Sequence, residues 1–311
     1  MTSQFTSLLQ VLDFFKEETT CISYLAHSRW GNEPSCPHCG NVGAYVTNRG
    51  YKCKAKECHK KFTVTMGTIF ENTKISLRIW FAAMYLCTAH RKGISSLQLS
   101  RDLNITQKTA WFLLHRIREM LNDWGDDKLS GVIEVDETYV GGSLKNKSNK
   151  KRRAIRHANE QWGGVKTAIF ALVEREGQVR TVMLANKKAK LIDVLPIIEA
   201  NVDKDAQIYT DSSSMYGSLK NTYKHEQVNH VQHEYVRGSV HTNTIEGFFS
   251  LLKRGVIGIY HYVSPKHLHR YCREFEYRYN NRKMLDVDRF EAAFKIANNK
   301  RLTYHALISN K

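Results

Sequence analysis

The spacing of apolar residues separates a helical first part of the chain from a later part rich in strands. Apolar side chains recur at helical intervals over residues 5–30 and again over residues 76–122. From residue 131 onward the pattern changes, and it predicts three strands, a helix and a fourth strand over residues 132–140, 165–173, 179–184, 189–201 and 206–210. Strands and helices in this order predict an α/β fold. Residues 264–300 are helical again in pattern.

The excess of basic residues indicates which kind of partner the protein binds. The chain has 47 Lys and Arg against 30 Asp and Glu, a formal net charge of +17. Such an excess attracts polyanions and predicts nucleic-acid binding that weakens with salt. The first residues lack the pattern of a secretion signal, and the longest apolar stretch, residues 80–87, is too short to cross a bilayer. We therefore expect no membrane partner and a cytoplasmic, nucleoid-associated location.

Two close pairs of cysteines predict a zinc ribbon over residues 34–72. Four thiolates held in tight turns supply the tetrahedral ligand set of structural Zn²⁺. The wider spacing of the second pair leaves His38 and His59 as alternative ligands. The other cysteines are scattered singly, which argues against a disulfide framework. The expected zinc ligands are Cys36, Cys39, Cys53 and Cys58.

Two predicted helices within residues 73–128 have the pattern of a helix-turn-helix. A short helix over residues 94–103 precedes a longer one over 107–121, which Thr106 can cap. In a helix-turn-helix, the first residues of the second helix enter the major groove. Here these would be Gln107, Lys108 and Thr109, with Arg116 and Arg118 nearer the DNA backbone. An ordinary helical hairpin would give the same pattern.

A basic insertion separates the first two strands of the predicted α/β domain. It spans residues 144–157, and it reads as a solvated loop that can also contact DNA phosphates without reading sequence. Its expected DNA-contacting residues are Lys150, Lys151, Arg152 and Arg153.

The first predicted strand carries carboxylates where apolar residues are usual. Glu134 and Asp136 share one face of it, and apolar residues take the other face. A central strand is normally apolar on both faces, so carboxylates there need a metal ion or a cationic partner. A solvated edge strand is the alternative. Glu137 is on the face opposite Asp136 and is the weaker candidate ligand.

Two further acidic residues complete a candidate site for divalent ions. Asp211 ends a predicted strand, where α/β active sites gather, although it could equally cap the helix that follows. Glu246 lies on a predicted helix, and Lys253, seven residues later, is on nearly the same face. Solvated surface positions are the alternative, although the apolar residues that surround the pair are consistent with a helix docked on a core. Carboxylates that converge on a pair of divalent ions can cut and join phosphodiesters.

The chain resembles insertion-sequence transposases of the ISXO type, which are related to the eukaryotic Merlin elements, over nearly all its length. The cysteine region is similar to the family's zinc-binding segment, residues 136–142 to its first catalytic block, and residues 241–255 and 271–282 to its C-terminal blocks. The resemblance implies an RNase H-like DDE catalytic domain over residues 129–300. This domain would follow a helical segment at residues 1–33, the zinc ribbon and the helix-turn-helix segment.

The resemblance also implies roles for individual residues. The DDE triad would be Asp136, Asp211 and Glu246, holding two Mg²⁺ ions for which Mn²⁺ could substitute. Some members of the group have a different third ligand, which makes Asn243 the alternative. We favour Glu246 because a carboxylate offsets cation charge better than an amide does. Lys253 would hold a phosphate near the scissile bond.

The expected function is that of a DNA transposase, which binds transposon ends and catalyses strand cleavage and strand transfer. Its partners would be double-stranded terminal inverted repeats and target DNA, bound by a homodimer. One rival hypothesis is a non-catalytic, domesticated DNA-binding protein that uses the ribbon and the helix pair. Another is a nuclease or resolvase with the same fold.

Overall fold

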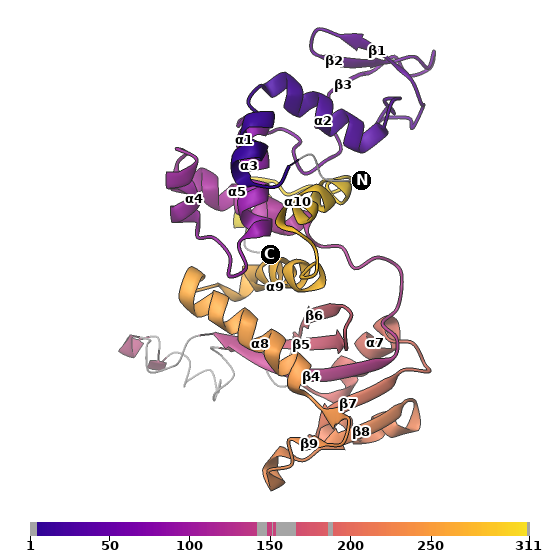
Figure 1. The fold of residues 1–311 in the computed structure, drawn as a ribbon, viewed down its shortest axis with the longest axis vertical. Helices are drawn as coiled ribbons and strands as arrows, with labels where there is room; N and C mark the ends of the chain where they lie inside the picture. Colours follow the sequence, from indigo (N-terminus) through magenta and orange to yellow (C-terminus); the bar gives the residue numbers. More distant parts are fainter. Residues whose placement is uncertain (1–4, 142–147, 151, 154–165, 186–188, 310–311) are drawn as a thin grey trace. The chain divides into compact units, whose positions relative to one another are not determined.

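Two compact units make up the chain. The computed structural model describes residues 5–141, 148–150, 152–153, 166–185 and 189–309 (Figure 1). Contacts group residues 1–123 with residues 281–311 in one unit, here called the helical unit. Residues 124–280 form the other, here called the sheet unit.

The core of the helical unit is built around α3 (Leu77–Ala89), whose side chains are almost all buried. α1 (Leu8–Phe14) and α2 (Glu18–Trp30) pack against it. The Phe15 and Phe81 rings meet edge to face, with centroids 4.8 Å apart. Ser76 caps α3 by accepting a hydrogen bond from the Ile79 amide. These helices confirm the helical periodicity of residues 5–30 and 76–122.

The C-terminal segment returns to complete this unit. α10 (Asp286–Lys295) packs against α2 and α3, and Phe294 lies 4.7 Å from Phe81 between ring centroids. The backbone joins it as well, because the Ile69 amide donates to the Ala297 carbonyl at 3.0 Å. The short helix α11 (Tyr304–Ile308) follows. Residues 281–300, expected in the α/β domain, thus pack in the helical unit, where aromatic side chains of α10 fill the core.

The expected helix pair is present as α4 (Ser96–Asp102) and α5 (Gln107–Met120), which pack on each other. Thr106 caps α5 as expected, since its side chain accepts from the Thr109 amide. Asn104 makes the turn with a positive φ of 51°, a conformation that asparagine tolerates better than most residues.

A small antiparallel sheet precedes α3. It contains β1 (Ala44–Thr47), β2 (Gly50–Cys53) and β3 (Lys61–Phe62) in that order. Gly50 is required at the β1–β2 turn, because its φ is +123° and a Cβ there would lie 2.6 Å from the Phe62 carbonyl oxygen.

The sheet unit is built on a mixed five-stranded sheet in the order β6-β5-β4-β7-β8. β5 is antiparallel to both β4 and β6, while β7 is parallel to both β4 and β8. This confirms the α/β expectation. The strands are β4 (Val132–Gly141), β5 (Lys166–Glu174), β6 (Val179–Met183), β7 (Gln207–Asp211) and β8 (Lys224–Val228).

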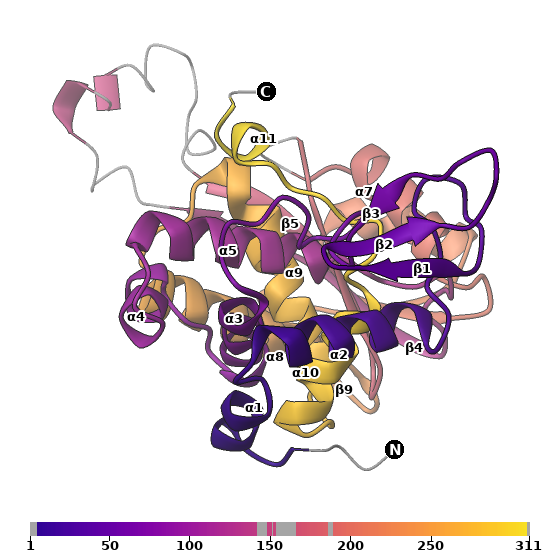
Figure 2. The same cartoon turned by 90° about the horizontal axis from the view of Figure 1, so that it is seen from above.

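Helices cover both faces of the sheet (Figure 2). α7 (Leu191–Asn201) and the 3-10 helix η2 (Ser214–Asn221) pack on the face that includes Ile133 and Val135. α8 (Asn243–Gly255), its π-helical extension η4 (Val256–Tyr260) and α9 (Pro265–Asn280) pack on the other face. Strand alternation puts Glu134 and Asp136 on the α8 side. The predicted split between apolar and acidic faces of this strand is confirmed.

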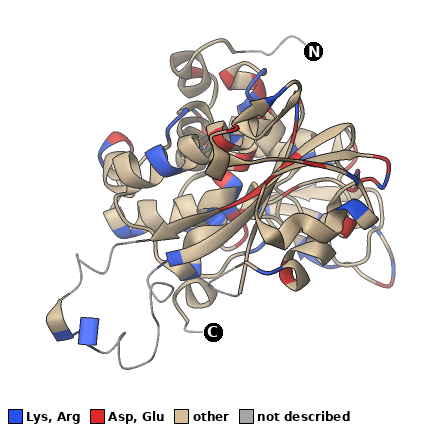
Figure 3. Cartoon of the chain, turned by 90° about the horizontal axis from the view of Figure 1, so that it is seen from below, with Lys and Arg blue, Asp and Glu red and all other residues tan. Residues whose placement is uncertain are grey.

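A hairpin of β9 (Val236–Arg237) and β10 (Val240–His241) leads into α8, after the 3-10 helix η3 (His230–Gln232). Among the described residues, no helix is long and apolar enough to cross a membrane. Basic and acidic residues are interspersed over helices and strands, so the excess positive charge is not confined to one element (Figure 3).

Candidate functional site

The register of β4 and β7 brings Asp136 and Asp211 level with each other. Glu134 pairs with Tyr209 in the parallel ladder, and two residues further along each strand lie Asp136 and Asp211. Neighbouring strands are about 4.8 Å apart, and residues two apart share a face. The two carboxylates therefore lie just beyond the end of the β4–β7 pairing, close enough for Asp211 to raise the pKa of Asp136.

One cavity of about 700 Å³ collects the expected catalytic residues. Its wall includes Asp136 from β4, Asp211 from β7, and Glu246 with Lys253 from α8. Asn243, the alternative third ligand, is exposed on the same helix but is not part of this wall. The geometry therefore favours Glu246 over Asn243.

The cavity concentrates negative charge around Asp136. Burial raises the pKa of Asp136 to about 7, and the nearby carboxylates of Glu137, Asp211 and Glu246 also raise it, against a lowering hydrogen bond from the Glu137 amide. No ion pair links these four carboxylates to a cation within the described ranges. Such a set of oxygen donors suits a hard divalent cation such as Mg²⁺.

Asp211 and Glu246 also make local hydrogen bonds. The Asp211 carboxylate accepts from the Ser213 amide at 3.1 Å. Ser213 is the N-cap residue of η2, so the alternative that Asp211 is the helix cap is wrong. Glu246 accepts from the Thr242 hydroxyl at 3.1 Å. Each carboxylate has a second oxygen that these bonds leave available to an ion.

Sequence reasoning missed several residues of the cavity. Glu137 lines it although it was set aside as facing away, and the Tyr216 hydroxyl donates to its carboxylate at 2.7 Å. β7 pairs with β4 only as far as Glu134, and beyond that point Asp136 and its neighbour Glu137 both line the cavity. His230 and Arg254 also line the cavity, and His230 comes from the short 3-10 helix η3, whose sequence carries no recognisable motif.

The four expected cysteines form a tight cluster in the helical unit. Their sulfur atoms all lie within 4.8 Å of one another, with Cys39 and Cys53 at 3.6 Å and Cys36 and Cys58 at 3.9 Å. Zn–S bonds of about 2.3 Å in a tetrahedron place the sulfurs about 3.8 Å apart. His38 and His59 are not members of the cluster. The spacing thus fits a Cys₄ zinc site.

The four clustered thiols do not share one pKa direction. Burial alone would raise the pKa of Cys36, but hydrogen bonds from the His38 and Cys39 amides bring it to about 7. Burial raises the pKa of Cys53 to about 12, as it does for the lone Cys21. The convergence of four sulfur atoms, which Cys21 lacks, is therefore what identifies the metal site.

The residues expected to contact DNA have mixed placements. Gln107 and Lys108 are exposed at the start of α5, although Gln107 donates to the Ser96 hydroxyl at 2.8 Å. Thr109 is half-buried beside the Thr106 cap. Lys150 and Arg153 are exposed and Arg152 is half-buried, whereas Lys151 lies outside the described residues.

Arg116 and Arg118 were expected near the DNA backbone, and that expectation is wrong. Both are buried, with exposed fractions of 5% and 1%. Arg116 donates to the carbonyls of Ile69 and Glu71 and lies over the Trp80 ring. Helical periodicity could not reveal this, because the partners come from the segment before α3.

The chain matches two known domain families and is similar in sequence to two known proteins. Residues 128–280 match the ISXO2-like transposase domain family, and residues 16–61 match the transposase zinc-ribbon domain family. An uncharacterized protein in transposable element ISH50 of Halobacterium salinarum is 30% identical over 275 residues, 85% of this chain and 91% of that protein. An uncharacterized transposase-like protein of Haemophilus influenzae is 30% identical over 105 residues, 33% of this chain and 82% of the relative.

Proposed function

The chain belongs to the family of insertion-sequence proteins with a transposase zinc ribbon and an ISXO2-like transposase domain, and from this we propose that it is a DDE-type DNA transposase. It would bind the terminal inverted repeats of its element and catalyse metal-dependent strand cleavage and strand transfer. One observation carries the proposal: carboxylates from β4, β7 and α8 line a single cavity with Lys253.

The donor set fits a pair of divalent ions. Asp136, Asp211 and Glu246 offer only oxygen ligands, and their mutual repulsion is relieved by positive charge. When bound, two such ions supply the Lewis acidity for in-line displacement at phosphorus. Asp136 and Asp211, which are level on adjacent strands, would hold ions jointly, and Glu246 would complete the set.

Other residues of the cavity would act on the DNA itself. Lys253 lies two helical turns after Glu246 and would hold a phosphate beside the scissile bond, aided by the neighbouring Arg254. Exposed Gln107 and Lys108 at the start of α5 support a helix-turn-helix that reads the transposon end. Lys150, Lys151, Arg152 and Arg153 would add phosphate contacts.

The remaining parts of the proposal concern fold and assembly. A zinc ion held by the cluster of four cysteines would stabilise the ribbon, which has few core residues of its own. The sheet, with three antiparallel strands and two more parallel to the first, supports an RNase H-like catalytic domain. Joining two ends requires a catalytic cavity for each, so the active form would be a homodimer on DNA.

The decisive experiment compares Asp136→Asn with wild type on a duplex that contains the inverted repeats flanking the gene. Mg²⁺-dependent cleavage should fall by at least about a thousandfold, since a ligand of both ions is weakened. Binding of the same duplex should persist. Asp205→Asn, an exposed change of equal charge in the sheet unit, is the control and should cleave normally. Undiminished cleavage by Asp136→Asn would rule out the triad, and no cleavage by wild type would favour the non-catalytic DNA-binding alternative.

A further inference from the structure

Helix α8, which carries Glu246, begins without a cap of its own. Its N-cap residue, Thr242, makes no side-chain hydrogen bond to the first amides of the helix, and its hydroxyl donates to Glu246 instead. The first turn of a helix has amide groups with no partner inside the helix. Something outside the helix must therefore satisfy those of α8.

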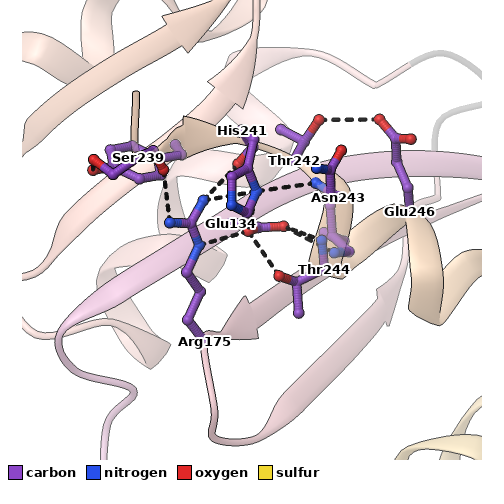
Figure 4. Close-up of polar contacts among 10 residues, drawn as sticks. Glu134, Arg175, Ser239, His241, Thr242, Asn243, Thr244 and Glu246 are labelled. Carbon is purple, nitrogen blue, oxygen red and sulfur yellow. Dashed lines mark hydrogen bonds and ion pairs between the residues drawn. The ribbon is translucent and has the colours of Figure 1, made fainter. Parts of the chain in front are cut away.

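Glu134 of β4 supplies that cap from a distant part of the sequence (Figure 4). Its Oε2 accepts from the amides of Thr244 at 2.8 Å and Ile245 at 2.9 Å. Its Oε1 accepts from the Thr244 hydroxyl at 2.9 Å and from Arg175 Nε at 2.7 Å. The side chain is fully buried, and all four partners are donors, as an ionised carboxylate requires.

Arg175 balances the buried charge and holds the chain just before the helix. Besides Glu134, it donates to the carbonyls of Ser239 at 2.7 Å and His241 at 3.0 Å. Its guanidinium also lies 4.8 Å from the centroid of the Tyr209 ring on β7. A buried carboxylate with one missing partner is strongly destabilising, so Glu134 and Arg175 are best regarded as a unit.

His241 completes the cluster beside Glu134 and Arg175. Its Nδ1 lies 2.9 Å from Arg175 Nη2 and 3.4 Å from the Asn243 amide. The same atom lies 3.3 Å from Glu134 Oε1. Arg175, whose guanidinium stays charged at any ordinary pH, is therefore the partner that offsets the Glu134 charge.

The cluster joins β4, which carries Asp136 of the proposed triad, to α8, which carries Glu246. Glu134 lies two residues before Asp136 on β4. It accepts a hydrogen bond from the amide of Ile245, which is next to Glu246 on α8. We propose that Glu134 is a positioning residue, which holds the first turn of α8 so that Glu246 reaches the same cavity as Asp136. The inference rests on the proposed function, because it gives Glu134 a role in ion binding without making it a ligand.

Glu134→Gln tests this role with little change of shape. An amide presents an NH₂ group where the carboxylate met only donors, so at least one bond to the first turn of α8 or to Arg175 must be lost. Removing a group that fixes the orientation of metal ligands weakens ion binding by about tenfold or more, and Glu134 acts on Glu246 through the first turn of α8. In the full-length protein, Mn²⁺ affinity measured by electron paramagnetic resonance should fall by about tenfold, and amide exchange should quicken over residues 242–248.

Glu276→Gln is a matched control in the same unit. Glu276 is also buried, accepts from the Thr181 amide at 2.7 Å and hydroxyl, and binds Arg273 at 2.9 Å. It is not part of the cavity wall. The control should lose comparable thermal stability, yet keep wild-type Mn²⁺ affinity and normal exchange over residues 242–248.

Thr244→Val keeps the proposal testable if Glu134→Gln does not fold. It removes only the hydroxyl bond to Glu134, and should weaken Mn²⁺ binding by about threefold to fivefold. The proposal is overturned if Glu134→Gln, or Thr244→Val in its place, binds Mn²⁺ as Glu276→Gln does. Failure of the proposed function would differ: Mn²⁺ binding would then be insensitive to Asp136→Asn, and exchange over residues 242–248 would still report whether Glu134 holds α8.

Discussion

The two candidate metal sites are built in opposite ways. The cysteine cluster takes its ligands from residues 36–58, in the small sheet and the turns that flank its strands, and its sulfurs lie within 4.8 Å of one another. The carboxylate cavity takes its residues from β4, β7 and α8, spread over more than a hundred positions. Its acidic groups surround an open space rather than a point, which suits two ions about 3.5–4 Å apart. The geometry of the cysteine cluster, the local site, therefore depends on the turns that carry it. The geometry of the carboxylate cavity, the distributed site, depends instead on strand register and on how α8 is held.

The largest expected effect is the loss of the local site. Cys53→Ser should remove one of four thiolate ligands, and structural zinc contributes about 10 kcal/mol or more to folding of small zinc domains. Zinc content, measured by inductively coupled plasma mass spectrometry, should fall from one ion per chain to none, and amide protection over residues 44–62 should collapse. Because the cluster is self-contained, exchange in the sheet unit should not change.

Cys58→His is the control for this change. Histidine is also a zinc ligand, so the variant should retain the ion. A Cys53→Ser protein with full zinc content would contradict the Cys₄ assignment.

A smaller effect, a gain rather than a loss of stability, is expected when a carboxylate of the distributed site is neutralised. The pKa of Asp136 is raised from 3.8 to about 7 in the folded protein. The folded state then holds this proton more tightly than the unfolded state, so stability is lost as pH rises from about 4 to 7. Asp136→Asn should remove that loss and stabilise the metal-free protein by about 2–4 kcal/mol at pH 8.

Calorimetric melting across pH 5–8 without added Mg²⁺ or Mn²⁺, which leaves the structural zinc in place, measures this effect. Asp205→Asn should follow the wild-type curve. Parallel curves for Asp136→Asn and wild type would show that burial and the neighbouring carboxylates do not raise the pKa of Asp136.

The smallest effect distinguishes two neighbours on α8. Glu246→Gln should lower the cleavage rate by about a hundredfold, or ~2.7 kcal/mol, because a ligand is exchanged for a weaker one. Asn243→Ala should change it by less than about threefold, since Asn243 does not line the cavity. Single-turnover cleavage with saturating DNA gives both rates. The reverse order would make Asn243 the third ligand.

The sequence predicted best those features that depend on neighbours along the chain. The strands at β4 to β7, the helix α7 and the Thr106 cap all follow from periodicity or from a short motif. β8 escaped prediction because Lys224–Val228 is largely polar, as an edge strand can be.

Features that depend on distant partners were not accessible to the same reasoning. The sequence indicated that Glu134 needs a cation or a metal, but its partners Arg175 and Thr244 are 41 and 110 positions away. Likewise, nothing near Arg116 shows that carbonyls 47 and 45 positions earlier bury its guanidinium. Whether a charged residue is buried depends on its partners in the tertiary structure, and the periodicity of the sequence does not identify these partners.

The return of α10 to the helical unit has a consequence for synthesis. Phe290 and Phe294 belong to the core that Phe15 and Phe81 begin, yet a ribosome adds them nearly 280 residues after Phe15. All residues of the sheet unit emerge before them. During translation, the apolar core around Phe15 and Phe81 therefore lacks these two rings until α10, which follows the sheet unit in the sequence, has been made.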